Sequence, residues 1–155
     1  MSTEDVTEQL ASFVAATRQG DLDPEAGKLA VDLLIDAVGV GVAGEHHADF
    51  GPLVDYSRDT AGVGGVPAPG GLDRDAGQAA FLYGAAIHIL DYDDIVVELG
   101  HSAAVLVSSA LAVGHTVGAS GPDIVTAIAV GAEVGSRLGR AANPGLYVSG
   151  WHPSA

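Results

Sequence analysis

Residues 29–44 read LAVDLLIDAVGVGVAG, and the pattern of this stretch indicates the fold class of the chain. Up to residue 43 its polar side chains are Asp32 and Asp36, which lie four residues apart and therefore on one narrow stripe of a helix. A helix that is apolar on every other side is typically buried among other elements. Asp23 followed by Pro24 predicts where this helix begins, and Gly44 predicts where it ends. We therefore predict a buried helix over this stretch.

Similar signals predict further helices on both sides of this one. Ser2 and Asp5 resemble a capping box, and the apolar residues that follow lie on one helical face, so we expect a first helix that ends at Gly20. Further helices are predicted over residues 49–58, 76–90, 102–117 (capped by Ser102) and 124–140 (capped at Ser120). The Gly- and Pro-rich residues 61–71 and the tail after residue 143 are predicted to be loops.

No stretch shows the period of two that is typical of a strand. We therefore predict the class as all-α, with residues 1–155 forming one helical domain. The apolar content of 48% is high, so either burial is extensive or a partner covers the apolar surface that this chain exposes.

Charge and composition exclude several functional classes. The net charge is −14, from 20 acidic and 6 basic residues, which argues against binding to nucleic acids or anionic membranes. The chain has no cysteine, so disulfides, thiolate nucleophiles and cysteine-held metal centres are excluded. No signal peptide or spanning apolar segment of about 20 residues is present, and we expect a cytoplasmic protein.

Three polar segments contain candidate catalytic residues. The first is the acidic segment of residues 91–94, at the predicted C-terminal end of a helix, where carboxylates are unfavourable and therefore indicate either a function or a solvated loop. The second is His101, ten residues after Asp91, because an aspartate beside a histidine can fix its tautomer for proton transfer. The third is His152 in a Gly-Trp-His-Pro segment, which by itself is more typical of a turn.

Other polar residues have simpler interpretations. His46, His47 and Asp49 could bind a metal, but a solvated loop is favoured, and we assign no metal site. The acidic segment could hold magnesium and a diphosphate, as in terpenoid enzymes, but no cluster of Lys or Arg accompanies it. His88 and His115 lie inside apolar helices and are expected to be hydrogen-bonded core residues.

The order of these segments resembles the MmgE/PrpD family of lyases and isomerases. Its members include 2-methylcitrate dehydratases, cis-aconitate decarboxylases and an iminodisuccinate epimerase. The resemblance covers nearly the whole chain and is carried by residues 36–44, 79–86, 90–94, 101–102, 120–123, 133–140 and 150–153.

This resemblance implies a helical-bundle domain of the MmgE/PrpD type, a substrate of the small polycarboxylate class and no cofactor. It implies that Asp91, His101 and His152 are catalytic. His101 would be the acid/base in proton abstraction next to a carboxylate, Asp91 its orienting partner, and His152 a donor to the substrate carboxylate. We assign Asp94 and Ser102 to substrate binding. A homo-oligomer or a complementing chain is the expected partner.

The chain also departs from the family pattern. Position 95 is Ile where many members have Thr, and the lysines and the lid domain of the family do not follow His152. We therefore expect no turnover of 2-methylcitrate or cis-aconitate by this chain alone. The alternative hypothesis is a non-catalytic truncated or split helical module that binds a partner chain.

Overall fold

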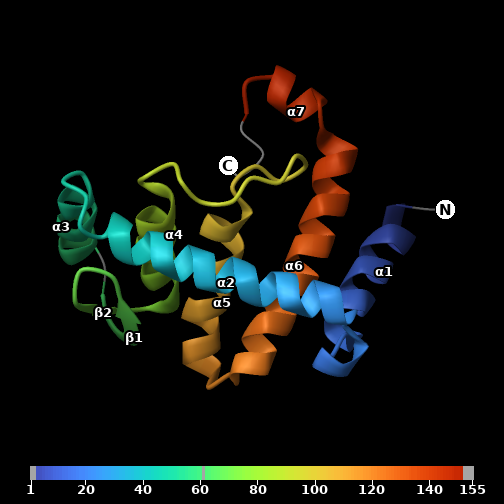
Figure 1. Ribbon diagram of the computed structural model, residues 1–155, viewed down its shortest axis with the longest axis horizontal. Helices are drawn as coiled ribbons and strands as arrows, with labels where there is room; N and C mark the ends of the chain where they lie inside the picture. Colours follow the sequence, from blue (N-terminus) through green and yellow to red (C-terminus); the bar gives the residue numbers. More distant parts are fainter. Residues whose placement is uncertain (1–2, 61, 152–155) are drawn as a thin grey trace.

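The computed structural model describes residues 3–60 and 62–151, and it confirms a predominantly helical class (Figure 1). Its helices are α1 (Thr3–Ala16), α2 (Pro24–Gly44), α3 (Phe50–Thr60), α4 (Ala76–His88), α5 (Ser102–Val117), α6 (Gly121–Ala142) and α7 (Gly145–Val148), with a short 3-10 turn, η1 (Gln19–Asp21). Strands β1 (Val63–Ala68) and β2 (Leu72–Arg74) form one small sheet.

Two predicted helix starts are confirmed by side-chain caps, whereas the capping residue predicted for the first helix, Ser2, lies outside the described residues. The Asp23 carboxylate accepts a hydrogen bond from the Glu25 N–H (2.8 Å) at the start of α2. Ser120 and Asp123 bond each other's backbone N–H groups at the start of α6, which forms a capping box. Ser102 is instead the first helical residue of α5, so its predicted role as the cap is wrong.

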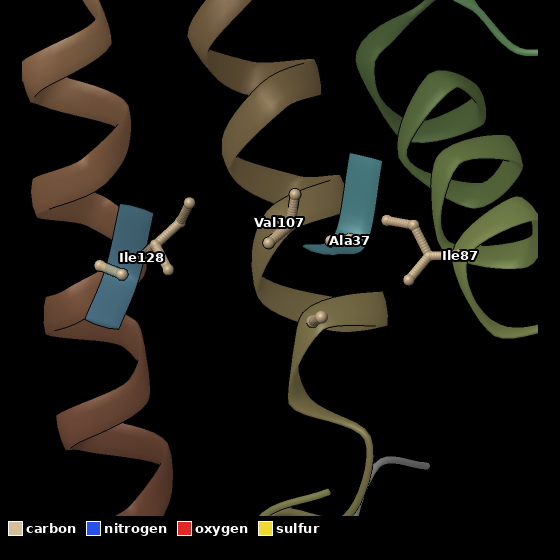
Figure 2. Packing of buried hydrophobic residues seen from close by; sticks show 6 residues of the cluster. Ala37, Ile87, Val107 and Ile128 are labelled. Carbon is tan, nitrogen blue, oxygen red and sulfur yellow. The ribbon is translucent and has the colours of Figure 1, made fainter. Parts of the chain in front are cut away.

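The core forms where α2 crosses the other long helices. In Figure 1, α2 runs across α4, α5 and α6, and all three contact it. Figure 2 shows Ala37 of α2 between Ile87 of α4 and Val107 of α5, with Ile128 of α6 beside them. These side chains are buried, and each large one stabilises the fold by about 1.5–3 kcal/mol.

Glycines permit the closest approaches between these helices. A Cβ atom at Gly44 would lie 1.9 Å from the carbonyl oxygen of Ala86, where α2 meets α4. A Cβ atom at Gly84 would lie 2.8 Å from the carbonyl oxygen of Ala104, where α4 meets α5. Close packing by small residues therefore fixes the position of the C-terminal half of α4, from which the candidate site extends.

The prediction that α2 is buried on nearly all sides is wrong for the described chain. Its inner face is covered, but Val31, Ile35 and Val42 on its outer face are exposed. Phe13 and Val14 of α1 are exposed as well. The helical pattern was interpreted correctly, but no described element packs over these faces.

None of the helices in residues 3–60 and 62–151 is long and apolar enough to cross a membrane.

Two segments predicted as loops contain regular structure. Within residues 61–71, β1 turns back to pair with β2, because Gly70 and Gly71 adopt positive φ angles of 80° and 68° that close the turn. The antiparallel register pairs Ala68 with Leu72. In the tail, α7 forms one helical turn after Pro144.

Candidate active site

The candidate site lies on the loop of residues 89–101, between the end of α4 and the start of α5. The loop folds back on itself because Val96 and Gly100 exchange backbone hydrogen bonds of 2.9 and 2.7 Å. Gly100 has a φ of 69°, which a side chain would disfavour. Because of this reversal, His101 lies next to the acidic residues 91–94. This proximity was expected from the sequence.

A second anchor holds this loop against α6. The side-chain amide of Asn143 donates to the Glu98 carbonyl oxygen (3.1 Å), and Arg140 forms an ion pair with the Glu98 carboxylate (3.1 Å). A Cβ atom at Gly139 would lie 2.1 Å from the Glu98 carbonyl oxygen, so glycine is required for this approach. The loop is therefore fixed at both helix ends and at α6.

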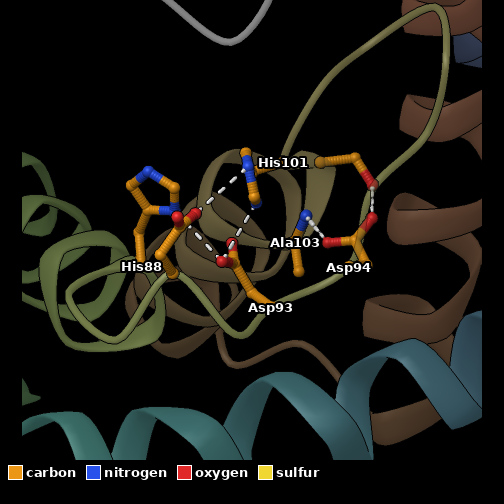
Figure 3. Close-up of polar contacts among 7 residues, drawn as sticks. His88, Asp93, Asp94, His101 and Ala103 are labelled. Atoms are coloured by element: carbon orange, nitrogen blue, oxygen red, sulfur yellow. Dashed lines mark hydrogen bonds and ion pairs between the residues drawn. The ribbon is translucent and has the colours of Figure 1, made fainter.

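Asp93 is the central residue of the site (Figure 3). Its side chain is 0% exposed, and its Oδ1 lies 3.0 Å from Nδ1 of His88 and 3.1 Å from Nδ1 of His101. The two imidazole rings are 4.5 Å apart between centroids and tilted by 57°. Within the described chain, Oδ2 of Asp93 is buried and has no hydrogen-bond partner. One buried carboxylate thus connects two histidines.

Asp91 lies on the other side of His101. Its Oδ1 is 3.6 Å from Nε2 of His101, and its side chain is 82% exposed whereas that of His101 is 11% exposed. Asp91 has a φ of 48°, in the left-handed region that few residues other than glycine adopt. The structure therefore brings the predicted pair together, but the carboxylate nearest to His101 is that of Asp93.

Asp94 and Ser102 bond each other at the start of α5. The Ser102 hydroxyl donates to Oδ2 of Asp94 (2.5 Å), and the backbone N–H of Ala103 donates to Oδ1 (2.7 Å). An acidic acceptor at a helix N-terminus satisfies an otherwise unpaired N–H and favours the helix dipole. The carboxylate of Asp94 thus has the capping role that the sequence indicated for Ser102. The predicted contacts of both residues with substrate stay a prediction.

The predictions for the remaining histidines have different outcomes. His152 lies outside the described residues, so its predicted catalytic role stays a prediction. His115 is exposed on α5 rather than a core residue. His88, which was also expected in the core, ends α4 with its side chain 48% exposed, although it is hydrogen-bonded as expected.

Sequence reasoning missed the roles of His88 and Asp93. The available signal was their separation of five residues across a helix end, beside a histidine eight residues further on. That spacing identifies no partner until the loop geometry is known.

Outside the candidate site, burial raises the pKa of Tyr83, whose hydroxyl donates to the Pro67 carbonyl oxygen (2.7 Å).

Comparisons with known proteins identify the family of the chain. The model of the MmgE/PrpD N-terminal domain matches residues 8–155. A cis-aconitate decarboxylase-like protein of Aspergillus oryzae, oryM, is 30% identical over 158 aligned residues, which cover 95% of this chain and 33% of that protein. The chain thus spans about a third of the length of this curated relative. No solved structure matches the chain significantly. The helical architecture and the match over almost the whole sequence establish that the chain belongs to the MmgE/PrpD family.

Proposed function

We propose that this chain carries the proton-transferring part of a MmgE/PrpD-type lyase or isomerase that acts on a small polycarboxylate. The observation that supports this most directly is the nearly buried His101, with its Nδ1 on the Asp93 carboxylate at 3.1 Å. A carboxylate can only accept hydrogen bonds, so Nδ1 of His101 donates. The neutral ring then has its lone pair on Nε2, which is the arrangement of a positioned general base.

The proposed reaction begins at a carbon next to a substrate carboxylate. Nε2 of His101 takes the proton, and the electron pair of the C–H bond moves into the carboxylate to give an enediolate. In a dehydration, this pair then expels a hydroxyl group, which leaves as water after protonation. In an isomerisation, the carbon is reprotonated. Asp93 would stabilise the imidazolium that forms, and such a base contributes about 10²- to 10⁴-fold to the rate.

Substrate charge places a further condition on the proposal. The loop itself carries Asp91, Asp93, Asp94 and Glu98, and their carboxylates would repel a polycarboxylate. Enediolate stabilisation requires cationic groups or hydrogen-bond donors. The proposal therefore includes donors outside the described loop. His152 is the predicted one within this chain, and cationic groups would come from a further segment or a partner chain.

The second candidate function is the non-catalytic module that binds a partner chain. It is favoured by the exposed apolar side chains on the outer face of α2, which include Val31, Ile35 and Val42. Such a face is typical of a surface that another protein segment covers. The two hypotheses differ in whether His101 transfers a proton, because a non-catalytic module would transfer none.

The test measures the first chemical step by itself. We would incubate the chain with 2-methylcitrate in D₂O and follow the loss of proton signals next to the carboxylates by NMR. We expect exchange above the protein-free rate, slow because enediolate stabilisation is incomplete, and a fall to the protein-free rate in His101→Gln. His115→Gln, which changes an exposed histidine on α5, is the matched control and should exchange like the wild type. Equal rates for the wild type and His101→Gln would contradict the proposal and favour the non-catalytic module.

A further inference from the structure

His88, Asp93 and His101 bring three potential metal ligands together. Their ligand atoms, two imidazole nitrogens and one carboxylate oxygen, lie within 4.8 Å of one another. Both Nδ1 atoms face the same oxygen, Oδ1 of Asp93, at 3.0 and 3.1 Å (Figure 3). We propose that these three residues bind a divalent transition-metal ion of the zinc class. This inference is independent of the proposed reaction.

The spacing of the ligand atoms fits such an ion. Zinc binds nitrogen and oxygen ligands at about 2.0–2.2 Å in tetrahedral geometry, which places neighbouring ligand atoms about 3.3–3.5 Å apart. Each Nδ1 is thus a few tenths of an ångström closer to Oδ1 than in a zinc site. A small outward movement of the two rings would admit the ion in place of the two Nδ1 protons, because each neutral ring can carry its proton on Nε2 instead.

The charge of the site favours a cation. The side chain of Asp93 is fully buried, and its ion pairs within the described chain are with the two histidines. Its Oδ2 is also buried and has no hydrogen-bond partner among the described residues. A buried carboxylate without a full set of partners is costly, and a divalent ion would offset both the charge and the missing contacts.

The ligand types select the class of metal. Two imidazoles and one carboxylate suit zinc and similar transition metals, whereas magnesium and calcium prefer oxygen ligands alone. Because His88 is 48% exposed, an ion would have a route from solvent and a coordination position open to water. The ligands are also held in place, since His88 ends α4 and His101 immediately precedes α5.

The other histidine pair of the chain is a matched comparison. His46 and His47 are exposed, and Nδ1 of His46 contacts its own helix at the Val42 carbonyl oxygen (2.8 Å). His47 lies 3.8 Å from the exposed carboxylate of Asp49 and accepts a hydrogen bond from the Asp49 N–H. These groups do not converge on one point, so we expect them not to contribute to high-affinity binding.

Metal binding would regulate the proposed reaction. An ion on Nδ1 of His101 would leave the ring proton on Nε2, so this nitrogen would no longer have the lone pair that takes a proton from substrate. This consequence rests on the proposed function, whereas the binding itself does not.

Titration of the chain with Zn²⁺ by calorimetry, and with Co²⁺ as a visible-absorption probe, tests the site. We expect one ion per chain and Co²⁺ bands of tetrahedral intensity. His88→Gln changes a half-exposed residue and should fold normally, which circular dichroism can verify. Since loss of even an outer partner of a metal ligand lowers affinity about 10- to 100-fold, loss of His88 should lower Zn²⁺ affinity at least about tenfold. His47→Gln should bind as the wild type does.

Unchanged affinity in His88→Gln, or no Co²⁺ band in the wild type, would show a hydrogen-bonded triad only and overturn the inference. Loss of binding in His47→Gln would place the ion at the exposed pair and overturn it too. No substrate is present in these titrations, so their failure is distinct from failure of the deuterium-exchange test. If both hold, Zn²⁺ should suppress exchange in the wild type at concentrations about tenfold lower than in His88→Gln.

Discussion

The loop between α4 and α5 and the outer face of α2 depart from the usual distribution of side chains in opposite directions. The loop buries the carboxylate of Asp93, whereas α2 leaves Val31, Ile35 and Val42 exposed. Burial of charge costs free energy unless the charge has partners, and exposed apolar surface forgoes the stabilisation that burial would provide. The first departure underlies the proposed chemistry, and the second underlies the proposed surface for another protein segment.

The largest effect on stability is expected when a buried isoleucine is compared with an exposed one. Ile128 is 1% exposed in the core and Ile35 is 65% exposed on α2. We expect Ile128→Ala to lower the free energy of unfolding by about 2–5 kcal/mol, because it removes buried contacts and leaves a cavity. Ile35→Ala should change it by less than about 0.5 kcal/mol. Urea denaturation measures both, and a large loss in Ile35→Ala would show that the outer face of α2 is covered in solution.

The next largest effect is expected when the two carboxylates near His101 are replaced one at a time. Asp93→Asn weakens the hydrogen bonds to both histidines and should cost about 1–3 kcal/mol, whereas Asp91→Asn changes an exposed group and should cost almost nothing. The ¹⁵N shifts of the His101 ring report its tautomer. We expect Asp93→Asn to reduce the Nδ1–H form and Asp91→Asn to preserve it. The opposite result would favour the sequence-based assignment of Asp91 as the orienting residue.

A smaller effect is expected at the start of α6, outside both regions. Ser120→Ala removes the cap and should destabilise the chain by about 1 kcal/mol. The Ser120 hydroxyl, and then its backbone N–H, hold the pKa of Asp123 below its usual range. A lowered folded-state pKa stabilises the fold above the unfolded pKa of about 3.9, and this stabilisation is lost as the pH falls through the folded pKa.

Thermal melts of the wild type and Ser120→Ala between pH 7 and pH 3 check this sign. The difference between the two melting temperatures should be largest near neutral pH and should shrink as Asp123 becomes protonated. A difference that grows toward pH 3 would contradict the assignment.

The smallest effect is expected where the loop meets α6. Arg140→Gln removes an ion pair with Glu98 on an exposed arginine, and such pairs contribute about 0–1 kcal/mol. Denaturation in low and high salt should show that the small loss disappears in high salt. A loss that persists in high salt would mean that Arg140 holds the loop through packing rather than charge.

Local sequence determined where most helices lie. Asp23 with Pro24, and Ser120 with Asp123, supply caps whose hydrogen bonds reach only a few residues, so their effect can be inferred from spacing alone. The same holds for the apolar periodicity of α2. The approach of Asp91 to His101 was also expected, because a short loop joins the two helices.

The tertiary structure decided which groups pair and which faces are covered. Asp93 meets His88 and His101 because the Val96–Gly100 reversal and the Glu98 contacts with α6 shape the loop, and such contacts have no signature in local sequence. The exposure of Ile35 follows from the absence of a described neighbour over that face of α2. Helix caps depend on short-range bonds that residue order fixes, whereas side-chain convergence and burial depend on contacts between distant segments.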